Sequence, residues 1–345
     1  MPFKKSFEFF LHKSNNNIMI INSNKQTTIN VFNQFFQNIS SFTLLNNHCN
    51  SLDMCFDIDD EDTIYGIIND KSGIVYFYNI TNNLCIGNSI INYNKDWYTL
   101  KCLCIKKINT VFHIFFYLCD KKKKNKCSLM HYYLKNSKWI KNTIVSINYK
   151  ILSNFIIIPQ KNLINIFYFN ILQDVTNLFV SSFDINTEVW SIPKQITKTN
   201  NHKVYLSVIL DKKDFFHIAF SENINSKYNC FYTKINLSNE NIDVLQNIAI
   251  NSSAVSSFPS IIEYNNTIIL QWIEYNKLFY CKSPNLGNSW TEPKLLHSSI
   301  NYDFIRCIYR SNNPILKINN SQIFIKETIN NISDILLPEK IIYKY

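Results

Sequence analysis

Residues 283–293 read Ser-Pro-Asn-Leu-Gly-Asn-Ser-Trp-Thr-Glu-Pro, and this segment says more about the fold than any other part of the chain. It is flanked by two apolar runs, as the turn of a β-hairpin is. Asn285 has a short side chain that can accept hydrogen bonds from nearby backbone amides, and Gly287 tolerates the positive φ that tight turns require. Trp290 brings a large apolar ring to the start of the next strand. The segment therefore predicts a hairpin.

The same residues resemble the Asp-box of the sialidase-like β-propellers, also called the BNR repeat. Ser283, Asn285, Gly287 and Trp290 stand at the positions that define the box. The family usually has Asp where this chain has Asn285. The Asp-box is a structural motif, so the resemblance implies a β-propeller blade and assigns no activity.

Repetition along the chain supports the same fold. Apolar runs at 111–115, 163–167 and 215–219 are spaced by 52 residues, and the run at 268–272 follows at 53. Periods of this kind are typical of repeat architectures. Each period contains four short runs rich in Ile, Phe, Tyr and Val, separated by Asn, Asp, Lys and Ser. Four strands per repeat indicate propeller blades.

Weaker copies of the apolar run near residues 10, 65 and 316 bring the number of repeats to seven. We therefore predict an all-β fold, a single β-propeller domain spanning residues 1–345, with seven four-stranded blades. Six blades, as in the better-known sialidase ring, is the alternative. The C-terminal run 340–345 is expected to pair with the N-terminal strands and close the ring. The predicted blades are 1–46 with 339–345, 52–92, 97–147, 150–199, 202–250, 255–299 and 301–338.

The activity that the family name suggests is not expected here. Sialidases of this family clamp the substrate carboxylate with three arginines, because the planar guanidinium binds carboxylates in a bidentate way that lysine does not reproduce. The chain contains only Arg306 and Arg310, which are close in sequence. Conventional sialidase activity is therefore not expected.

Other glycosidases need only two suitably separated carboxylates. The chain offers an acidic segment at 57–62, which reads Asp-Ile-Asp-Asp-Glu-Asp, and two glutamates near the box, Glu263 and Glu274. The acidic segment falls between two expected strands, so we interpret it as a solvated loop. No catalytic residue is predicted, and whether the chain is an enzyme stays uncertain, with non-enzyme favoured.

Histidines and cysteines indicate structural roles. His113 and His217 occupy equivalent positions in their repeats, which favours packing over catalysis. Cys102 and Cys104 are two residues apart in an expected strand and should face the same way, without a second pair to complete a metal site. Cys119 and Cys127 flank a hairpin loop and could meet across it, although free thiols are favoured. No metal site or cofactor is predicted.

A cluster of lysines is the feature that most suggests a partner. The formal net charge is +10, and part of it is concentrated between Cys119 and Cys127. This loop is expected to join the second and third strands of its blade, on the face where propellers commonly bind ligands. An anionic partner is one interpretation, and a solvated hairpin tip is the other. The lysines concerned are Lys121, Lys122, Lys123, Lys124 and Lys126.

Taken together, these patterns favour a non-catalytic binding or scaffold propeller that recognises a protein or a glycan through one face of the ring. A glycoside hydrolase or lyase with a carboxylate pair at the channel mouth is the alternative. Because arginine is scarce, specific nucleic-acid recognition is not expected. We find no signal peptide and no membrane span, so a cytoplasmic location is expected.

Overall fold

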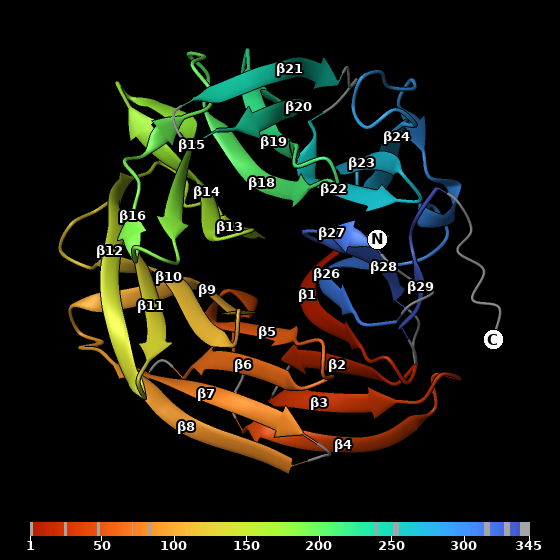
Figure 1. Ribbon diagram of the computed structural model, residues 1–345. Coiled ribbons are helices and arrows are strands. Elements are labelled where there is room, and N and C mark those ends of the chain that lie inside the picture. The colour runs from red at the N-terminus through yellow and green to blue at the C-terminus, as the bar shows by residue number, and fades with distance from the viewer. Residues whose placement is uncertain are drawn as a thin grey trace. The chain divides into compact units, whose positions relative to one another are not determined.

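The computed structural model describes most of the chain, and its regular structure is almost entirely β (Figure 1). Two short 3-10 helices, η1 (Ser51–Asp53) and η2 (His297–Ser299), are the exceptions among the described residues. No helix in this described part is long and apolar enough to cross a membrane. The described residues are 3–23, 26–46, 49–70, 72–81, 84–238, 241–250, 255–313, 318–327 and 332–338.

The chain divides into two compact units, and residues 7–148 with 308–317 form one of them. Its first sheet contains β1 (Phe3–His12), β2 (Ile18–Ser23), β3 (Thr27–Phe32) and β4 (Asn38–Leu45). Its second sheet contains β5 (Met54–Ile58), β6 (Ile64–Asn69), β7 (Ile74–Thr81) and β8 (Leu84–Asn92). Its third contains β9 (Tyr98–Ile108), β10 (Val111–Asp120), β11 (Lys126–Lys135) and β12 (Lys138–Asn148).

The other unit contains residues 149–307, 318–344 and the first six residues. One sheet contains β13 (Ile156–Gln160), β14 (Leu163–Leu172), β15 (Val175–Asp184), β16 (Val189–Trp190) and β17 (Lys194–Gln195). The next contains β18 (Lys203–Leu210), β19 (Phe216–Ile224), β20 (Lys227–Leu237) and β21 (Ile242–Ile250). The last contains β22 (Ser257–Tyr264), β23 (Thr267–Glu274), β24 (Lys277–Ser283), β25 (Lys294–Leu295) and β27 (Asn319–Asn320).

The fold is a β-propeller with six blades, so the alternative number is correct and the preferred number of seven is wrong. The difference arises at the ends of the chain. The strands β26 (Phe304–Ser311), β28 (Ile323–Glu327) and β29 (Ile332–Ile335) do not form a seventh sheet. They extend the first sheet in the order β29-β28-β26-β1-β2-β3-β4. The expected strand at 340–345 lies outside the described residues.

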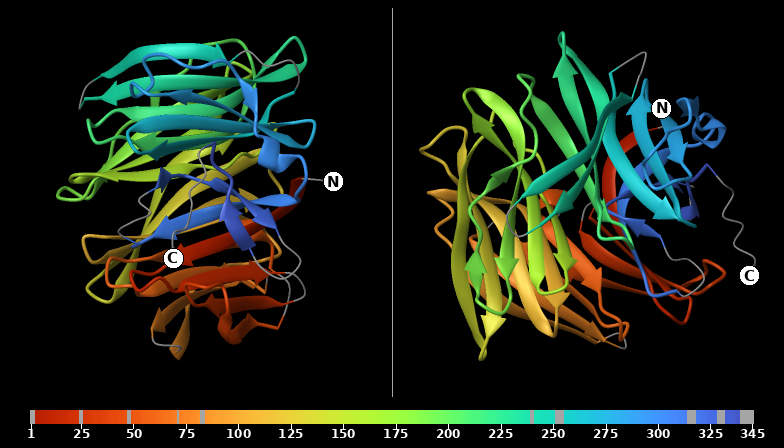
Figure 2. Two further views of the ribbon diagram at one scale, coloured as in Figure 1. Left: turned by 90° about the vertical axis from the view of Figure 1, so that its right-hand side faces the viewer. Right: turned by 45° about the horizontal axis from the view of Figure 1, so that its top comes forward.

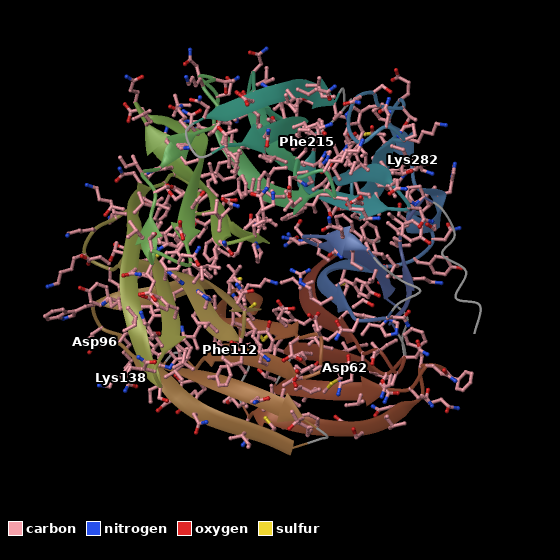
Figure 3. All side chains as sticks on the ribbon, in the orientation of Figure 1. Asp62, Asp96, Phe112, Lys138, Phe215 and Lys282 are labelled. Carbon is pink, nitrogen blue, oxygen red and sulfur yellow. The ribbon has the colours of Figure 1, made fainter. Side chains whose placement is uncertain are left out.

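The repeated apolar run marks the second strand of five sheets. In β6 all six residues are buried, and most of β14, β19 and β23 is buried too. Strands covered on both faces read as continuous apolar runs, which explains why these segments gave the clearest repeat. In the unit of residues 7–148 the second and third sheets lie side by side (Figure 2). The rings of Tyr65 in β6 and Phe112 in β10 pack against each other, with centroids 5.2 Å apart; Figure 3 labels Phe112.

A bulge recurs in the first strand of three sheets. Cys102, Tyr205 and Phe258 have φ values of 55°, 59° and 53°, and the ladder register shifts beside each of them. A bulge interrupts the alternation of side chains along a strand. The sequence suggested that Cys102 and Cys104 point to the same face of the strand, and this expectation is wrong. Cys102 interacts with Cys119, whereas Cys104 interacts with Cys55.

Candidate anion-binding pocket

A pocket of about 250 Å³ lies within the unit of residues 7–148. It is formed where η1 meets β5, where β6 ends, and where the β8–β9 connection leads into β9. The β10–β11 loop supplies its last residue, Lys121. The lining residues are Asp53, Asn69, Tyr93, Lys95, Asp96, Tyr98, Thr99, Lys101 and Lys121.

The tyrosine side of the pocket is held by local hydrogen bonds. The Tyr93 hydroxyl donates to Asn69 Oδ1 over 2.9 Å, and the Tyr93 amide donates to the carbonyl of Gly73 over 2.8 Å. Gly73 has a φ of 107°, and a Cβ there would lie 2.6 Å from the Tyr93 carbonyl oxygen. Glycine is needed at this close approach. Burial raises the pKa of Tyr93, so its hydroxyl stays protonated and available as a donor at neutral pH.

An Asn-initiated turn shapes the β8–β9 connection. The amides of Asp96 and Tyr98 donate to the side chain and the carbonyl of Asn94, over 2.9 and 3.0 Å respectively. Asn is favoured at such positions because its side chain can close the turn itself. The turn displays Trp97, whose side chain is 55% exposed, between two pocket residues (Figure 3 labels Asp96).

The predicted lysine loop contributes unequally to the pocket. Lys121 lines it: its amide donates to the Trp97 carbonyl over 2.8 Å, and its Nζ donates to the Lys95 carbonyl over 2.6 Å. The Lys122 ammonium lies over the Trp97 ring, 5.3 Å from the centroid. Lys123 pairs with Asp120 over 3.8 Å. Lys124 and Lys126 are exposed and are not part of the lining.

The pocket offers both kinds of polar contact. Lys95, Lys101 and Lys121 bring ammonium donors, while Asp53 and Asp96 bring carboxylate acceptors. The two carboxylates differ in access, because Asp53 is 2% exposed and Asp96 lies on the surface. A ligand that carries both an anionic group and hydroxyl groups matches this set.

The box at 283–290 has a closed set of hydrogen bonds and adopts a structural geometry. The Gly287 amide donates to Ser283 Oγ over 2.7 Å, and the Ser289 amide donates to Asn285 Oδ1 over 2.9 Å. Gly287 has a φ of 87°. The Trp290 ring packs edge-on against Tyr232, with centroids 4.6 Å apart. Ser283 and Gly287 are buried and Trp290 packs on the interior, whereas Asn285 and Ser289 are exposed.

A related turn precedes β16. The Ser191 amide donates to the Ser182 carbonyl over 2.8 Å, and the Ser182 amide donates to Ser191 Oγ over 2.9 Å. Thr291 and Lys282 exchange the same two bonds beside the box, over 2.9 and 3.0 Å. The repeat in sequence thus corresponds to a repeat in hydrogen bonding.

The two equivalent histidines are buried and bonded to other side chains. His217 Nε2 lies 3.0 Å from Asp211 Oδ2, and its Nδ1 lies 2.8 Å from the Tyr232 hydroxyl. His113 Nδ1 lies 2.9 Å from His131 Nε2. Burial lowers the pKa of His113 to about 4, so its ring is neutral at neutral pH. Neither histidine lines the pocket.

The interpretation of residues 57–62 as a solvated loop is wrong for the first of them. Asp57 belongs to β5 and is 5% exposed, and its carboxylate pairs with Lys106 and with Arg310, whose Nε lies 3.6 Å away. Asp59 pairs with Lys107 over 2.6 Å. Partners from other strands neutralise these carboxylates, which a reading of local sequence cannot reveal.

Asp62 is also engaged, since it accepts hydrogen bonds from Ser14 and Asn312 (Figure 3). Arg310 lies in β26 together with Arg306, and Arg306 stands over the Phe258 ring at 4.0 Å. In the described part of the chain, no group of three or more His, Cys, Asp or Glu side chains is arranged to hold a metal ion.

Sequence reasoning missed most of the pocket. Its lining comes from strand ends and connections separated by up to about seventy residues, from Asp53 to Lys121, and only Lys121 stood out as part of a charge cluster. The one usable signal was Asn94-Lys95-Asp96-Trp97-Tyr98, where two charged and then two aromatic residues follow a turn former. Such a segment is typical of exposed recognition loops.

Comparison with known proteins supports the fold. No protein-family model matches the sequence, and no curated protein matches it. An ulvan lyase of a new polysaccharide lyase family, bound to -[GlcA(1-4)Rha3S]-, is similar in structure with a TM-score of 0.64 and 10% identity, over 95% of this chain and 92% of that one. The Dos1 propeller is similar with a TM-score of 0.51 and 9% identity, over 80% of this chain and 67% of that one.

A sialidase from Trypanosoma rangeli is also among the similar structures, with a TM-score of 0.41 and 11% identity, over 66% of this chain and 42% of that one. That likeness is too weak to carry an argument. At these identities the comparisons place the chain among β-propellers and say nothing of its activity.

Proposed function

We propose that this propeller is a binding protein for an anionic saccharide, which it holds in the pocket between β5, β6 and β9. The observation that carries the proposal is the mixed lining, with ammonium groups, carboxylates and tyrosines around one cavity of about 250 Å³. Lysines bind carboxylate or sulfate groups, and the exposed Asp96 carboxylate can accept bonds from sugar hydroxyls. Trp97 adds an exposed aromatic face at the rim.

The pocket favours a saccharide over other anions. The carboxylates of Asp53 and Asp96 would repel a polyphosphate backbone, whereas a sugar chain presents hydroxyl donors to the exposed Asp96. Pockets for drug-sized ligands measure about 300–1,000 Å³, so this cavity suits about one or two sugar units of a longer chain. An ulvan lyase with the same fold is described as bound to -[GlcA(1-4)Rha3S]-, which agrees with the ligand class inferred from the pocket.

Cleavage of the saccharide by a hydrolase or lyase is the alternative. Asp53 and Asp96 are the two carboxylates of the pocket, and Tyr93 lies beside them. We favour binding because the Asp53 side chain is 2% exposed and offers a substrate little surface to reach. Glycosidases place both carboxyl groups against the scissile bond.

Isothermal titration calorimetry tests the proposal. The purified protein is titrated with charged and with neutral oligosaccharides of equal length. Sulfated or uronate-containing chains should bind, neutral chains should bind at least about tenfold more weakly, and added salt should weaken the charged ligands. Equal binding of neutral chains would overturn the assignment. Mass analysis of the mixture then separates binding from cleavage, since shortened products would favour the enzymatic alternative.

A double variant locates the site. Lys101→Gln with Lys121→Gln removes two ammonium groups of the pocket and should lower the affinity for the charged chains. Lys138→Gln is the matched control, because Lys138 is an exposed lysine of the same sheet, at the β11–β12 turn. Consecutive hairpin turns lie at opposite ends of an antiparallel sheet, so Lys138 is remote from the β10–β11 loop. An unchanged affinity in the double variant would place the ligand elsewhere.

A further inference from the structure

Two thiols meet between the first strands of neighbouring sheets. Cys55 belongs to β5 and Cys104 to β9, and their side chains are hydrogen-bonded to each other. Cys55 is buried, while Cys104 is partly exposed. Both strands belong to the unit of residues 7–148. A buried cysteine thus lies against one whose residue keeps part of its surface exposed.

The neighbouring side chains confirm how the strands face each other. Side chains two residues apart in a strand lie on the same face, so Asp57 follows Cys55 and Lys106 follows Cys104 on the facing surfaces. Asp57 and Lys106 form an ion pair. The ion pair and the thiol pair are therefore successive rungs between the same two strands. Arg310 Nε lies 3.6 Å from Asp57 Oδ1 and adds a second cation to this rung.

The charged groups distinguish the two thiols. The hydrogen bond from Cys55 lowers the pKa of Cys104, and the positive charges of Lys106 and Arg310 act in the same direction, against burial and the Asp57 carboxylate. The same hydrogen bond, together with burial, raises the pKa of Cys55. Because the thiolate is the reactive form of cysteine, Cys104 is the nucleophile of the pair.

We propose that Cys104 and Cys55 are a peroxide-reactive dithiol, in which hydrogen peroxide oxidises Cys104 and Cys55 then closes a disulfide. The Cys104 thiolate attacks one oxygen of the peroxide, the O–O bond breaks, and hydroxide leaves as Cys104 becomes a sulfenic acid. The Cys55 sulfur attacks the Cys104 sulfur, and the S–OH oxygen departs with the Cys55 proton as water. Two thiols are oxidised by two electrons in total, and one peroxide is reduced to two waters.

A second thiol pair in the same unit provides an internal control. Cys119 and Cys127 are directly opposite each other on β10 and β11, so they are as close in the fold as a cross-strand pair can be. The hydrogen bond from Cys119 and burial raise the pKa of Cys127. Oxidation of this pair shows what proximity alone contributes.

The proposal goes beyond saccharide binding and is tested without any saccharide. The reduced full-length protein is treated with limiting hydrogen peroxide, free thiols are blocked by alkylation, and cross-linked peptides are mapped by mass spectrometry. The Cys55–Cys104 linkage should appear before the Cys119–Cys127 linkage, because the positive charges of Lys106 and Arg310 favour the Cys104 thiolate. Equal rates for the two pairs, or no Cys55–Cys104 linkage, would overturn the proposal.

Variants separate the two roles. Cys55→Ser should leave a sulfenic acid on Cys104 that dimedone labels, and Cys104→Ser should abolish both the label and the linkage. Lys106→Gln should slow the reaction and shift its pH profile upward, whereas Lys106→Arg should restore both. Circular dichroism confirms that each variant is folded. Oxidation of the Cys104→Ser protein to a linked product at the original rate would show that Cys104 is not the nucleophile.

Discussion

The box hairpin at 283–290 and the lysine hairpin at 119–127 are similar local structures with opposite environments. The box turns inward: Lys234 from β20 donates to the Leu286 carbonyl over 2.9 Å, and Gly287 meets the Tyr232 hydroxyl. The lysine hairpin turns outward, with Lys121 at a pocket and its neighbours in solvent. The difference shows that a hairpin connection can pack on the protein interior or border a pocket, depending on what lies beneath it.

The histidines show the same contrast within the repeat. His217 has a carboxylate partner, Asp211, and a hydroxyl partner, Tyr232, beneath the box. His113 is stacked on His131, with ring centroids 5.2 Å apart, and burial lowers its pKa to about 4. Equivalent positions share burial, while their polar partners differ.

The largest expected effect is loss of stability in Gly287→Ala. A Cβ at Gly287 would lie 1.9 Å from the Tyr232 hydroxyl oxygen, and the φ of 87° is one that alanine resists. We expect destabilisation of about 3 kcal/mol or more, measured by urea unfolding.

Two further variants make that experiment specific. Tyr232→Phe removes the oxygen that Cβ would meet, so Gly287→Ala should cost less in that background, a coupling that a double-mutant cycle measures. Glu292→Ala, at an exposed position in the same connection, should change stability by less than about 0.5 kcal/mol. Additive effects of the first two substitutions would mean that the contact is unimportant.

The next largest effect concerns pH and His113. Its pKa is about 4 in the folded chain and about 6.5 when unfolded, so the unfolded state binds the proton first as the pH falls. Stability from the neutral ring is complete above about pH 6.5 and declines towards pH 4, by about 3 kcal/mol.

The chain itself suggests the replacement, because Asn165 occupies the equivalent position in the next repeat. Between pH 6.5 and pH 4, the free energy of unfolding of His113→Asn should fall by about 3 kcal/mol less than that of the parent protein. Urea unfolding at each pH measures this difference. His12, whose pKa burial also lowers to about 4, remains as a second source of acid sensitivity in both proteins. Parallel stability curves for the two proteins would contradict this prediction.

A smaller effect is expected from the pocket lysines, and it should appear in binding alone. Lys101→Gln with Lys121→Gln should weaken charged oligosaccharides by about 2 kcal/mol in total, since hydrogen bonds to charged groups are worth about 1.5–3 kcal/mol at best and partial exposure reduces them. Thermal unfolding should change little. A large loss of stability would instead make these lysines structural, as the box residues are.

The smallest effect is expected for Trp97→Ala. The ring is 55% exposed, so stability should change by less than about 0.5 kcal/mol. Affinity for the saccharide should fall by about 1 kcal/mol if the ring packs against a sugar face. An unchanged affinity would show that the ligand does not contact Trp97 at the rim. The role of the pocket lysines is measured by the double variant.

Much of the fold could be predicted from local sequence. The apolar run at 163–167 lies within β14, and the run at 268–272 lies within β23. The second strand of each sheet is easy to recognise in the sequence because it is apolar on both faces. The number of blades was harder, because the run around residue 10 resembles a second strand, yet β1 is hydrogen-bonded on both sides, to β26 and β2.

The candidate site was much less predictable. Lys121 stood out by its charged neighbours, but Asp53, Tyr93 and Lys101 are unremarkable in sequence. Asp57 looked solvated because its partners Lys106 and Arg310 are about 50 and 250 residues away. Polar residues take their roles from neighbours that the chain brings in from other strands, and no local pattern encodes these contacts.

The sequence by itself determined that the chain is all-β, that it repeats about every fifty residues, and that Gly287 forms a tight turn. These properties depend on side-chain alternation and backbone sterics over a few residues. Only the tertiary structure decided that there are six blades, that one hairpin lies beside a pocket, and that Cys55 meets Cys104. Each of these depends on strand pairing or sheet packing between distant segments, whose free energy is absent from any single stretch of chain.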